Sequence, residues 1–493
     1  MILERTFTTK EERGTSMNWE ALLSTQKLGN DEKEPEEFSR YPMNEFEKDY
    51  NKIVSSSAFR RLQDKTQVFP LDKSDFIRTR LTHSIEVSTV ARQLGIMLSK
   101  NRTQYRPADI NAEAAEGISS VLLCAGLLHD LGNPPFGHFG ETTIGDWFKK
   151  HLDDIRYKKK PLREWLTPQM ARDLENFEGN AQALRILAKA RYHSGINLSA
   201  AVISTLVKYP TDSCSFDKDS PDIKKHKLGY FAAEEETLRT LSQITGTMDA
   251  GNNLCRHPLT YMLEAADDIA YATADLEDAF KKNLFTLDEF TDFYENSYDA
   301  SKIAAHQSPE YYTKQLILDL KKRRESMKDS AAFGTWLNYT RRWLMFVAIY
   351  RFSKSYGEIK DGTYKQDLFY ATNHSLTIKI LKKAMPAFVF DSADILKLEL
   401  SSETILSFLL QKFVNAALYF DAEYADEEHG YVQTKADKKY FSIFSENYKQ
   451  DYMNAKTHKE GYDLYLRLLM VTDYISGMTD TYARTLYREL SGI

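Results

Sequence analysis

Apolar residues recur with helical spacing along most of this chain. After position 83, one stretch places apolar residues three and four positions apart, on one face of a helix: Val87, Val90, Ala91, Leu94, Met97 and Leu98. Similar patterns occur in 258–280, 343–352, 402–420 and 462–470, and no convincing run of alternating apolar and polar residues indicates a β-sheet. The pattern therefore predicts a mainly α-helical protein.

The most apolar of these stretches ends in a polar segment. Residues 112–131 predict a buried helix that ends on the adjacent pair His129 and Asp130. The segment 132–135, with one glycine and two prolines, then breaks the helix, and the turn after it presents another histidine and a glutamate. Imidazole and carboxylate groups in apolar surroundings cost free energy unless a partner compensates them. A metal ion is the partner that this segment indicates.

Two other predicted helices carry polar residues beside their apolar faces. His83 lies one turn before its apolar stripe begins, so we expect it to point into the core. In the predicted helix 258–280, Asp267, Tyr271 and Asp275 follow one another at intervals of four and form a polar row on the flank of the stripe. Taken singly, a core histidine is usually hydrogen-bonded and a helix aspartate is usually a surface charge.

Taken together, His83, His129, Asp130 and Asp267 offer two imidazoles and two carboxylates. This mixed nitrogen and oxygen set suits Mn²⁺, Fe²⁺, Co²⁺, Ni²⁺ or Zn²⁺ and, less well, Mg²⁺. Four protein ligands on an octahedral ion would leave positions for water and a phosphate oxygen. Spacing alone leaves the hydrogen-bonded histidine and the surface charge open as alternatives for His83 and Asp267.

Composition narrows the class of protein. The 493 residues suggest roughly three domains, and a net charge of −6 provides no global basic field for nucleic acid. Three cysteines without a CxxC spacing argue against a disulfide framework or a thiolate zinc site. No apolar run reaches the roughly 18 residues of a membrane helix, and the polar N-terminus predicts no signal peptide. We expect a cytoplasmic protein without a membrane partner, starting at either Met1 or Met17.

Six segments, in this order along the chain, carry a resemblance to a known family: 57–63, 78–84, 129–141, 177–182, 264–271 and 473–480. With the pattern H…HD…D, the chain resembles the HD superfamily of metal-dependent phosphohydrolases, and more narrowly the dGTPase-like deoxynucleoside triphosphate triphosphohydrolases. The HD dipeptide alone is a weak signal, whereas 129–141 together with 264–271 is highly specific. The resemblance extends from about residue 41 to the C-terminus.

The resemblance implies a fold and an activity. The expected fold is an HD-domain helical bundle, elaborated by further helices into one large compact unit. Its expected parts are an irregular extension over 1–40, a catalytic core over 41–290 and a C-terminal helical region over 291–493 that completes the nucleotide site. The implied reaction is hydrolysis of a dNTP, such as dGTP, to a deoxynucleoside and inorganic triphosphate, which would regulate dNTP pools.

The resemblance also implies roles for single residues. The metal ligands fall on His83, His129, Asp130 and Asp267, with Mn²⁺ or Mg²⁺ expected first and Fe²⁺, Co²⁺, Ni²⁺ or Zn²⁺ as alternatives. His138 and Glu141 are the implied catalytic pair, in which the imidazole supplies or relays a proton and the carboxylate holds the ring. Whether His138 or a metal-bound water acts first stays open.

The expected substrate contacts are Arg80, Gln67, Tyr271, Asp275, Glu178 and Asn180. A tyrosine under the sugar C2′ would leave no room for a 2′-hydroxyl, so the resemblance implies a preference for deoxynucleotides. Arg60 and Arg61 are further candidates for the phosphates, since arginine suits bidentate phosphate contacts, and Glu86 is a further candidate for the nucleoside side. For Glu178, an interaction with a helix dipole is the alternative.

Two other functions remain open at this point. One is an HD phosphodiesterase or nucleotidase that acts on another phosphoester, and the other is a catalytically silent HD protein that binds a nucleotide or ssDNA. The expected partners are a dNTP substrate, a dNTP activator or ssDNA effector, and further copies of the chain in a hexamer or tetramer. The sequence leaves base preference, native metal and oligomer size open.

Overall fold

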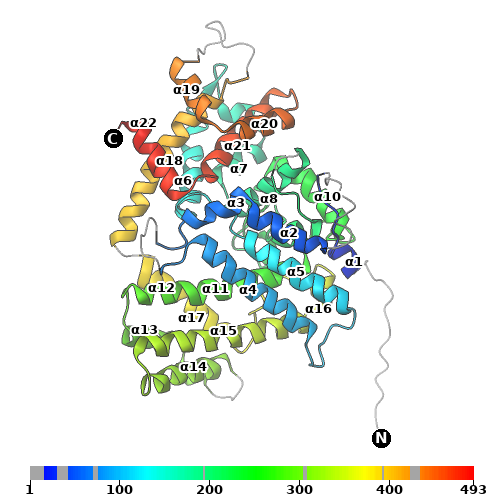
Figure 1. Cartoon of the computed structure of the whole chain (residues 1–493), viewed down its shortest axis with the longest axis vertical. Helices are drawn as coiled ribbons and strands as arrows, with labels where there is room; N and C mark the ends of the chain where they lie inside the picture. The colour runs from blue at the N-terminus through cyan, green and yellow to red at the C-terminus, as the bar shows by residue number, and fades with distance from the viewer. Residues whose placement is uncertain are drawn as a thin grey trace.

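The computed structural model describes seven stretches of the chain: 16–29, 43–69, 76–192, 195–303, 308–390, 393–421 and 433–492. Within them the regular secondary structure is almost entirely helical, which confirms the predicted fold class (Figure 1). The strands in these stretches, β1 (Arg156–Tyr157) and β2 (Lys160–Pro161), form one antiparallel hairpin. In the same stretches, no helix combines the length and the apolar character that a membrane span requires.

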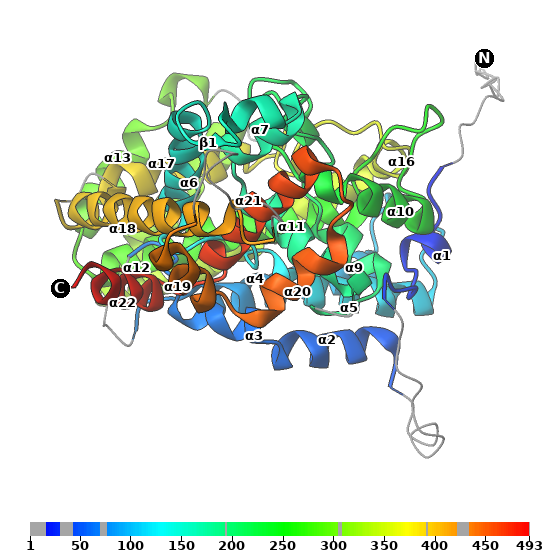
Figure 2. The same ribbon diagram turned by 90° about the horizontal axis from the view of Figure 1, so that it is seen from above.

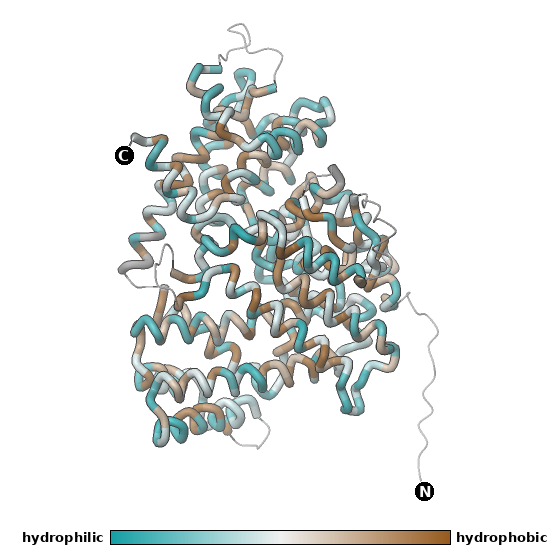
Figure 3. The backbone as a smooth tube through the Cα atoms, viewed as in Figure 1, coloured by the Kyte–Doolittle hydropathy of each residue, from teal (hydrophilic) through white to brown (hydrophobic). Residues whose placement is uncertain are grey.

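Helices α4 (Arg80–Ser99), α5 (Ala112–Leu128) and α11 (Pro258–Ala270) form the centre of the molecule (Figure 1). Helices α4 and α5 approach closely at Gly126. A Cβ atom at this position would lie only 2.4 Å from the Cα atom of Ser88. Helix α2 (Glu45–Ser55) packs against α5, and α15 (Asp329–Lys354) packs against α11. Figure 3 shows hydrophobic and hydrophilic segments alternating along these helices, the pattern expected of helices with one buried face.

A second hydrophobic core joins α6 (Gly137–His151) to the C-terminal helices α18 (Ala393–Ala417) and α21 (Glu460–Ser476). Phe148, Phe413 and Leu469 are fully buried in it. Figures 1 and 2 show α18 next to α22 (Asp480–Ser491) at one end of the molecule. The C-terminal helices therefore pack on the helix that follows the His129–Asp130 turn. The division at residues 40 and 290 stays a prediction.

The remaining α-helices surround these two cores: α1 (Trp19–Leu22), α3 (Ser57–Arg60), α7 (Pro168–Glu175), α8 (Gly179–Ala188), α9 (Ala200–Leu206), α10 (Glu235–Thr245), α12 (Leu276–Lys281), α13 (Leu287–Asn296), α14 (Pro309–Arg324), α16 (Tyr356–Lys360), α17 (Ser375–Met385), α19 (Lys435–Ile443) and α20 (Glu446–Ala455). Short helical turns of other types connect them: η2 (Arg61–Asp64), η3 (Leu162–Trp165), η4 (Lys189–Tyr192), η5 (Ile223–Lys225), η6 (Ala232–Glu234), η7 (Tyr271–Asp275), η8 (Ala300–Lys302) and η9 (Pro386–Phe390). Of these, η7 and η9 are π-helices.

Two segments differ from the periodicity prediction. The predicted helix 258–280 is divided, because the π-helical turn η7 separates α11 from α12. Helical periodicity also does not predict the β1–β2 hairpin, whose turn residues Lys158 and Lys159 have φ angles of 46° and 68°. Lysine seldom adopts this left-handed conformation, and the turn lacks the Gly or Asn that usually marks such a hairpin in a sequence. The sequence therefore carried no signal for this turn.

Candidate active site

A cavity of about 440 Å³ lies between α4, the turn after α5, α8, α11 and the early part of α18. It is lined by all the predicted site residues except Asp275: Gln67, Arg80, His83, His129, Asp130, His138, Glu141, Glu178, Asn180, Asp267 and Tyr271. These residues span more than 200 positions in the sequence and come from several different elements. Folding therefore brings the predicted residues together around one space.

Three predicted metal ligands converge at the ends of α4 and α5. One donor atom each from His83, His129 and Asp130 lies within 4.8 Å of the other two. The Nδ1 atom of His129 is 2.9 Å from the Gly126 carbonyl oxygen, which can only accept, so Nδ1 carries the proton. This leaves Nε2 of His129 as a buried acceptor without a hydrogen-bond partner. Such an orphaned lone pair, beside an aspartate, fits a metal ligand.

Asp267 lies beside this group, whereas the carboxylate of its neighbour Asp268 pairs elsewhere. The Oδ1 atom of Asp267 is 3.4 Å from Nε2 of His83 and 3.5 Å from Nε2 of His129. Asp268 instead forms an ion pair of 2.6 Å with Lys382. The geometry therefore favours Asp267 as the fourth ligand position.

The charge states of Asp267, Asp130 and His129 suit a cation. Burial alone would raise the pKa of Asp267, but Lys208, 2.6 Å from its Oδ2 atom, and the two histidines hold that pKa well below its ordinary value. Arg80, 2.7 Å from Asp130, likewise keeps the pKa of this buried carboxyl below its ordinary value. Burial lowers the pKa of His129, so its imidazole is neutral near pH 7. Ionised carboxylates and a neutral imidazole are the forms that bind metals.

His138 and Glu141 form a hydrogen-bonded pair in the first turn of α6. The turn that presents them is left-handed at Phe136 (φ 65°) and Gly137 (φ 63°). A Cβ atom at Gly137 would lie 2.7 Å from the Arg80 guanidinium, so glycine leaves room for that side chain. The Nδ1 atom of His138 lies 2.5 Å from Oε2 of Glu141.

The environments of the two side chains differ. The His138 side chain is 82% exposed and the Glu141 side chain only 8%. The Gly179 backbone N–H donates to Oε1 of Glu141 at 2.8 Å. The hydrogen bond to Glu141 raises the pKa of His138, which favours a protonated imidazole at the cavity surface. This arrangement suits a general acid that a buried carboxylate holds in place.

Cationic side chains that the sequence did not single out also line the cavity. Lys208, Lys227 and Lys382 join Arg80 on its wall. Lys227 comes from the segment between η5 and η6 and lies 3.1 Å from Glu178. No motif or periodic spacing connects these lysines to the histidines, so only the tertiary structure reveals them.

Glu178 precedes α8 but makes no capping hydrogen bond to that helix. Its carboxylate accepts from Asn180 at 2.6 Å and pairs with Lys227 instead. These contacts favour a place among the polar groups of the cavity over the helix-dipole alternative.

At the end of the cavity near Tyr271, Asp275 is buried behind the wall. Burial raises the pKa of Asp275 to about 7. Its Oδ2 atom accepts a long hydrogen bond of 3.5 Å from Gln67. Asp275 is therefore placed to act through Gln67. The π-helical turn buries its side chain, and its expected contact with the substrate stays a prediction.

Arg60, Arg61 and Glu86 do not line the cavity, so the structure gives their candidacy no support and it stays a prediction. Arg60 donates to the Ser55 carbonyl, and Arg61 donates to the Gly477 carbonyl at 3.2 Å. Glu86 pairs with Arg78. The turn at η2 directs both arginines away from the histidines.

The C-terminal segment 473–480, whose chemistry the sequence left unassigned, holds the cavity wall in place. Asp480 accepts from the backbone N–H groups of Thr66 at 3.0 Å and Phe136 at 2.9 Å. Lys65 donates to the carbonyl oxygens of Asn133 and Ser476, both at 2.6 Å. The segment thus ties the start of the cavity wall to the turn before His138.

Comparison with known proteins agrees with this geometry. The profile that describes the HD domain family matches residues 80–208, a range that includes His83, His129 and Asp130. A deoxyguanosinetriphosphate triphosphohydrolase-like protein of Listeria monocytogenes is 42% identical, over 91% of this chain and 94% of the relative. A protein of the same description from Synechocystis is 32% identical over 97% and 100%. A deoxyguanosinetriphosphate triphosphohydrolase of Yersinia enterocolitica is 31% identical over 90% and 93%.

Proposed function

The chain belongs to the dGTPase-like triphosphohydrolases, a family of HD-domain enzymes, and we propose that it cleaves a dNTP such as dGTP with the help of a divalent metal. The products would be a deoxynucleoside and inorganic triphosphate. One observation carries the proposal: the His83–His129–Asp130 group and the His138–Glu141 pair face one cavity that cationic side chains line. The group would hold the ion, and the pair would act on the scissile bond.

We assign the metal site to His83, His129, Asp130 and Asp267, with Mn²⁺ or Mg²⁺ as the first candidates. The unpartnered Nε2 atom of His129 and the low pKa values of both aspartates support this assignment. A bound divalent ion would polarise a phosphate oxygen and so make the α-phosphorus more electrophilic.

Arg80, Lys208, Lys227 and Lys382 are the proposed triphosphate contacts, because a triphosphate carries several negative charges into a partly enclosed space. Arg80 provides a planar fork for two phosphate oxygens, while each lysine provides a mobile point charge. Lys208 and Lys382 already pair with Asp267 and Asp268, so they would be shared between the acids and the substrate.

His138 is the proposed general acid. In the reaction, a water oxygen bonds to the α-phosphorus and releases one proton to the solvent, while the bond between that phosphorus and the 5′-oxygen breaks. The leaving 5′-oxygen takes a proton from the Nε2 atom of His138, whose other nitrogen is held by Glu141. Since Glu141 raises the pKa of His138, the imidazole would carry this proton near neutral pH.

Tyr271 lines the cavity within one turn of Asp267 and is the proposed contact of the deoxyribose C2′ position. Gln67, with Asp275 behind it, is the proposed contact of the sugar on the opposite side. A ring packed against C2′ would reject ribonucleotides by steric exclusion. Regulation of dNTP pools, a cytoplasmic location, a homo-oligomer, and a dNTP or ssDNA effector stay predictions.

Product analysis tests the proposal. The purified protein is incubated with each dNTP and with dNTP mixtures, with Mn²⁺ or Mg²⁺ and with or without ssDNA, and the products are identified by mass spectrometry. Deoxynucleoside and triphosphate are expected. Release of orthophosphate or pyrophosphate would support another HD phosphohydrolase instead, and no release from any dNTP or mixture would support a silent nucleotide-binding protein.

The His138→Ala variant tests the division of labour within the site. We expect kcat to fall by roughly 10²- to 10⁴-fold, the typical contribution of general acid catalysis, and the metal content to stay unchanged. The exposed His458→Ala variant is the matched control and should retain both properties. Loss of metal in His138→Ala would show that this histidine is a ligand.

A further inference from the structure

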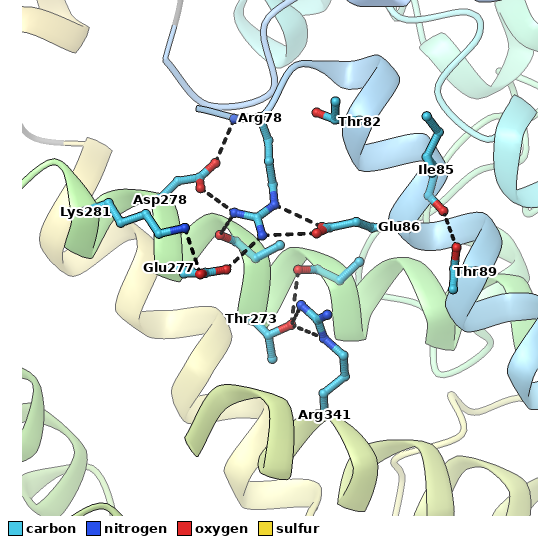
Figure 4. Close-up of polar contacts among 12 residues, drawn as sticks. Arg78, Thr82, Ile85, Glu86, Thr89, Thr273, Glu277, Asp278, Lys281 and Arg341 are labelled. Atoms are coloured by element: carbon cyan, nitrogen blue, oxygen red, sulfur yellow. Dashed lines mark hydrogen bonds and ion pairs between the residues drawn. The ribbon is translucent and has the colours of Figure 1, made fainter. Parts of the chain in front are cut away.

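An ion-pair network lies next to the sugar end of the cavity, on residues that the proposed mechanism does not use (Figure 4). Its centre is Arg78, two positions before α4. The Arg78 guanidinium donates to Glu86 at 3.0 Å through two bonds, to Glu277 at 2.8 Å, to Asp278, and to the Ala274 carbonyl at 3.2 Å. These five bonds use all five N–H donors of the side chain.

The backbone of Arg78 joins the same network. Its N–H donates to Oδ2 of Asp278 at 2.9 Å, so Asp278 binds both the main chain and the side chain of one residue. The next residue, Thr79, caps α4 through its side chain. Arg78 therefore connects the first turn of α4 directly to α12.

Arg341 supports the same region from α15 (Figure 4). Its Nε and Nη2 atoms donate to the Thr273 hydroxyl at 3.1 and 2.9 Å. Lys281 pairs with Glu277 at 2.8 Å. Two arginines and one lysine thus balance the three carboxylates of the network, and a half-buried cluster of this kind is stable only with its charges compensated.

The element between these two arginines is η7, the π-helical turn that contains Tyr271 and Asp275. Arg78 holds the Ala274 carbonyl and Arg341 holds the Thr273 hydroxyl, both within this turn. A π-helical turn interrupts the regular helical hydrogen bonding, and such turns are frequent at functional sites. Contacts from outside the helix can therefore set its shape.

The hydrogen bond that joins Gln67 in the cavity wall to Asp275 in η7 is weaker than the Arg78 contacts. Gln67 and Asp275 are joined by one hydrogen bond of 3.5 Å. The Oε1 atom of Gln67 and the Oδ1 atom of Asp275 are both buried without a hydrogen-bond partner. The Arg78 guanidinium, with three bonds to Ala274, Asp278 and Glu277 and two to Glu86 in α4, is thus the stronger hydrogen-bonded link between α4 and this part of the chain.

We propose that Arg78 is a positioning residue that sets the distance between α4 and η7, and thereby the ability of Tyr271 to reject a 2′-hydroxyl. The inference rests on the proposed function, because it assumes that Tyr271 faces the sugar. α4 carries Arg80 and His83, which would fix the phosphates and the ion, so a shift of η7 would move the tyrosine relative to a substrate held at its other end. Misplacement by about 1 Å is enough to change recognition 10²-fold.

The test compares Arg78→Lys with the wild-type protein. Lysine keeps the charge but cannot bridge three carboxylates through a planar fork. We expect the preference for dGTP over GTP to fall by about 10- to 100-fold, with KM for dGTP raised more than kcat is lowered and the metal content unchanged. Glu86→Gln, which leaves Glu277 and Asp278 on the fork, should cause a smaller change in the same direction.

Arg324→Lys is the matched control, since Arg324 also bridges two carboxylates, Asp288 and Asp329, on helices α13 and α15. It should leave the preference and KM unchanged. If Arg78→Lys lowers only the unfolding temperature and keeps the wild-type preference, Arg78 is purely structural and the inference is overturned.

Equilibrium binding of dGTP and GTP, measured in parallel by calorimetry, separates this inference from the proposed function. If the wild-type protein binds dGTP in preference to GTP without hydrolysing it, and Arg78→Lys loses that preference, the proposed function fails and the positioning role stands. If the wild-type protein hydrolyses dGTP and Arg78→Lys binds both nucleotides with the wild-type ratio, the proposed function stands and the positioning role of Arg78 fails.

Discussion

Two histidines of the site lie beside carboxylates, yet their pKa values shift in opposite directions. Burial lowers the pKa of His129, while the hydrogen bond that His138 donates to Glu141 raises the pKa of His138. The His129 side chain is 1% exposed, whereas that of His138 is 82% exposed. The same residue type therefore supplies a neutral lone pair at one position and a proton at the other.

The Glu141→Gln variant tests this difference through pH. Because protonated His138 is the proposed acid, kcat should fall as the pH rises through the raised pKa of His138. Glutamine removes the negative charge, so that pKa should return toward the ordinary value of about 6.5 and the alkaline limb should move to lower pH. The profile of kcat against pH measures the shift. Asp146→Asn, on the exposed side of the same helix, should keep the wild-type limb, and an unmoved limb in Glu141→Gln would assign the titration to another group.

Among the elements, the crossing of α4 and α5 sets the distance between two proposed ligands. His83 lies in the first turn of α4, and His129 directly follows α5. The crossing is close because Gly126 has no side chain: a Cβ atom there would lie 2.4 Å from Cα and 2.7 Å from N of Ser88. The backbone of Ser88 cannot yield as a flexible side chain would.

We therefore expect Gly126→Ala to force the two helices apart. The free energy of unfolding should fall by about 1–3 kcal/mol, as in other overpacked cores, and metal affinity should fall as well. Denaturant unfolding and metal titration measure the two effects.

Gly334→Ala provides the comparison, because no atom lies within 4 Å of its Cβ position in α15. Alanine there should stabilise the protein by up to about 1 kcal/mol, since glycine is unfavourable inside a helix. Equal stability of the two variants would mean that the α4–α5 crossing adapts to the added methyl group.

On the scale of the whole molecule, one buried carboxylate links the two hydrophobic cores. Asp473, in α21 of the second core, accepts from Gln182 at 2.8 Å and from Arg185 at 2.8 and 2.9 Å. Both partners lie in α8, whose Leu184 and Leu187 belong to the first core. Burial would raise the pKa of Asp473, but Arg185 and Lys189 lower it to about 2, so the carboxylate is ionised in the folded protein.

Asp473→Asn keeps the shape of this side chain and removes its charge, which leaves Arg185 with Glu234 as its remaining acidic partner. We expect a loss of about 3–5 kcal/mol in the free energy of unfolding, the usual result of removing one member of a buried ion pair. Denaturant unfolding measures it. Asp153→Asn, in an exposed pair with Arg163, should change stability little, and a similarly small change at Asp473 would contradict the linking role.

The sequence by itself predicted the mainly helical fold and, with the family resemblance, many of the residues that line the cavity. Helical periodicity depends on near neighbours in the chain, and the segment 129–141 carries two histidines, an aspartate and a glutamate within one turn-forming stretch. Because these signals are local, they could be read without knowledge of which helices meet. The resemblance then assigned Asp267, far along the chain, to the same group.

Only the tertiary structure decided the contacts between distant segments. Lys208, Lys227 and Lys382 reach the cavity, Asp480 ties the Thr66 backbone to Phe136, and the turn η7 buries Asp275. A contact between residues far apart in the sequence leaves no periodic pattern, because each partner alone is an ordinary polar residue on a helix or loop. Packing brings such partners together, so their roles depend on which surfaces the folded helices bury against each other.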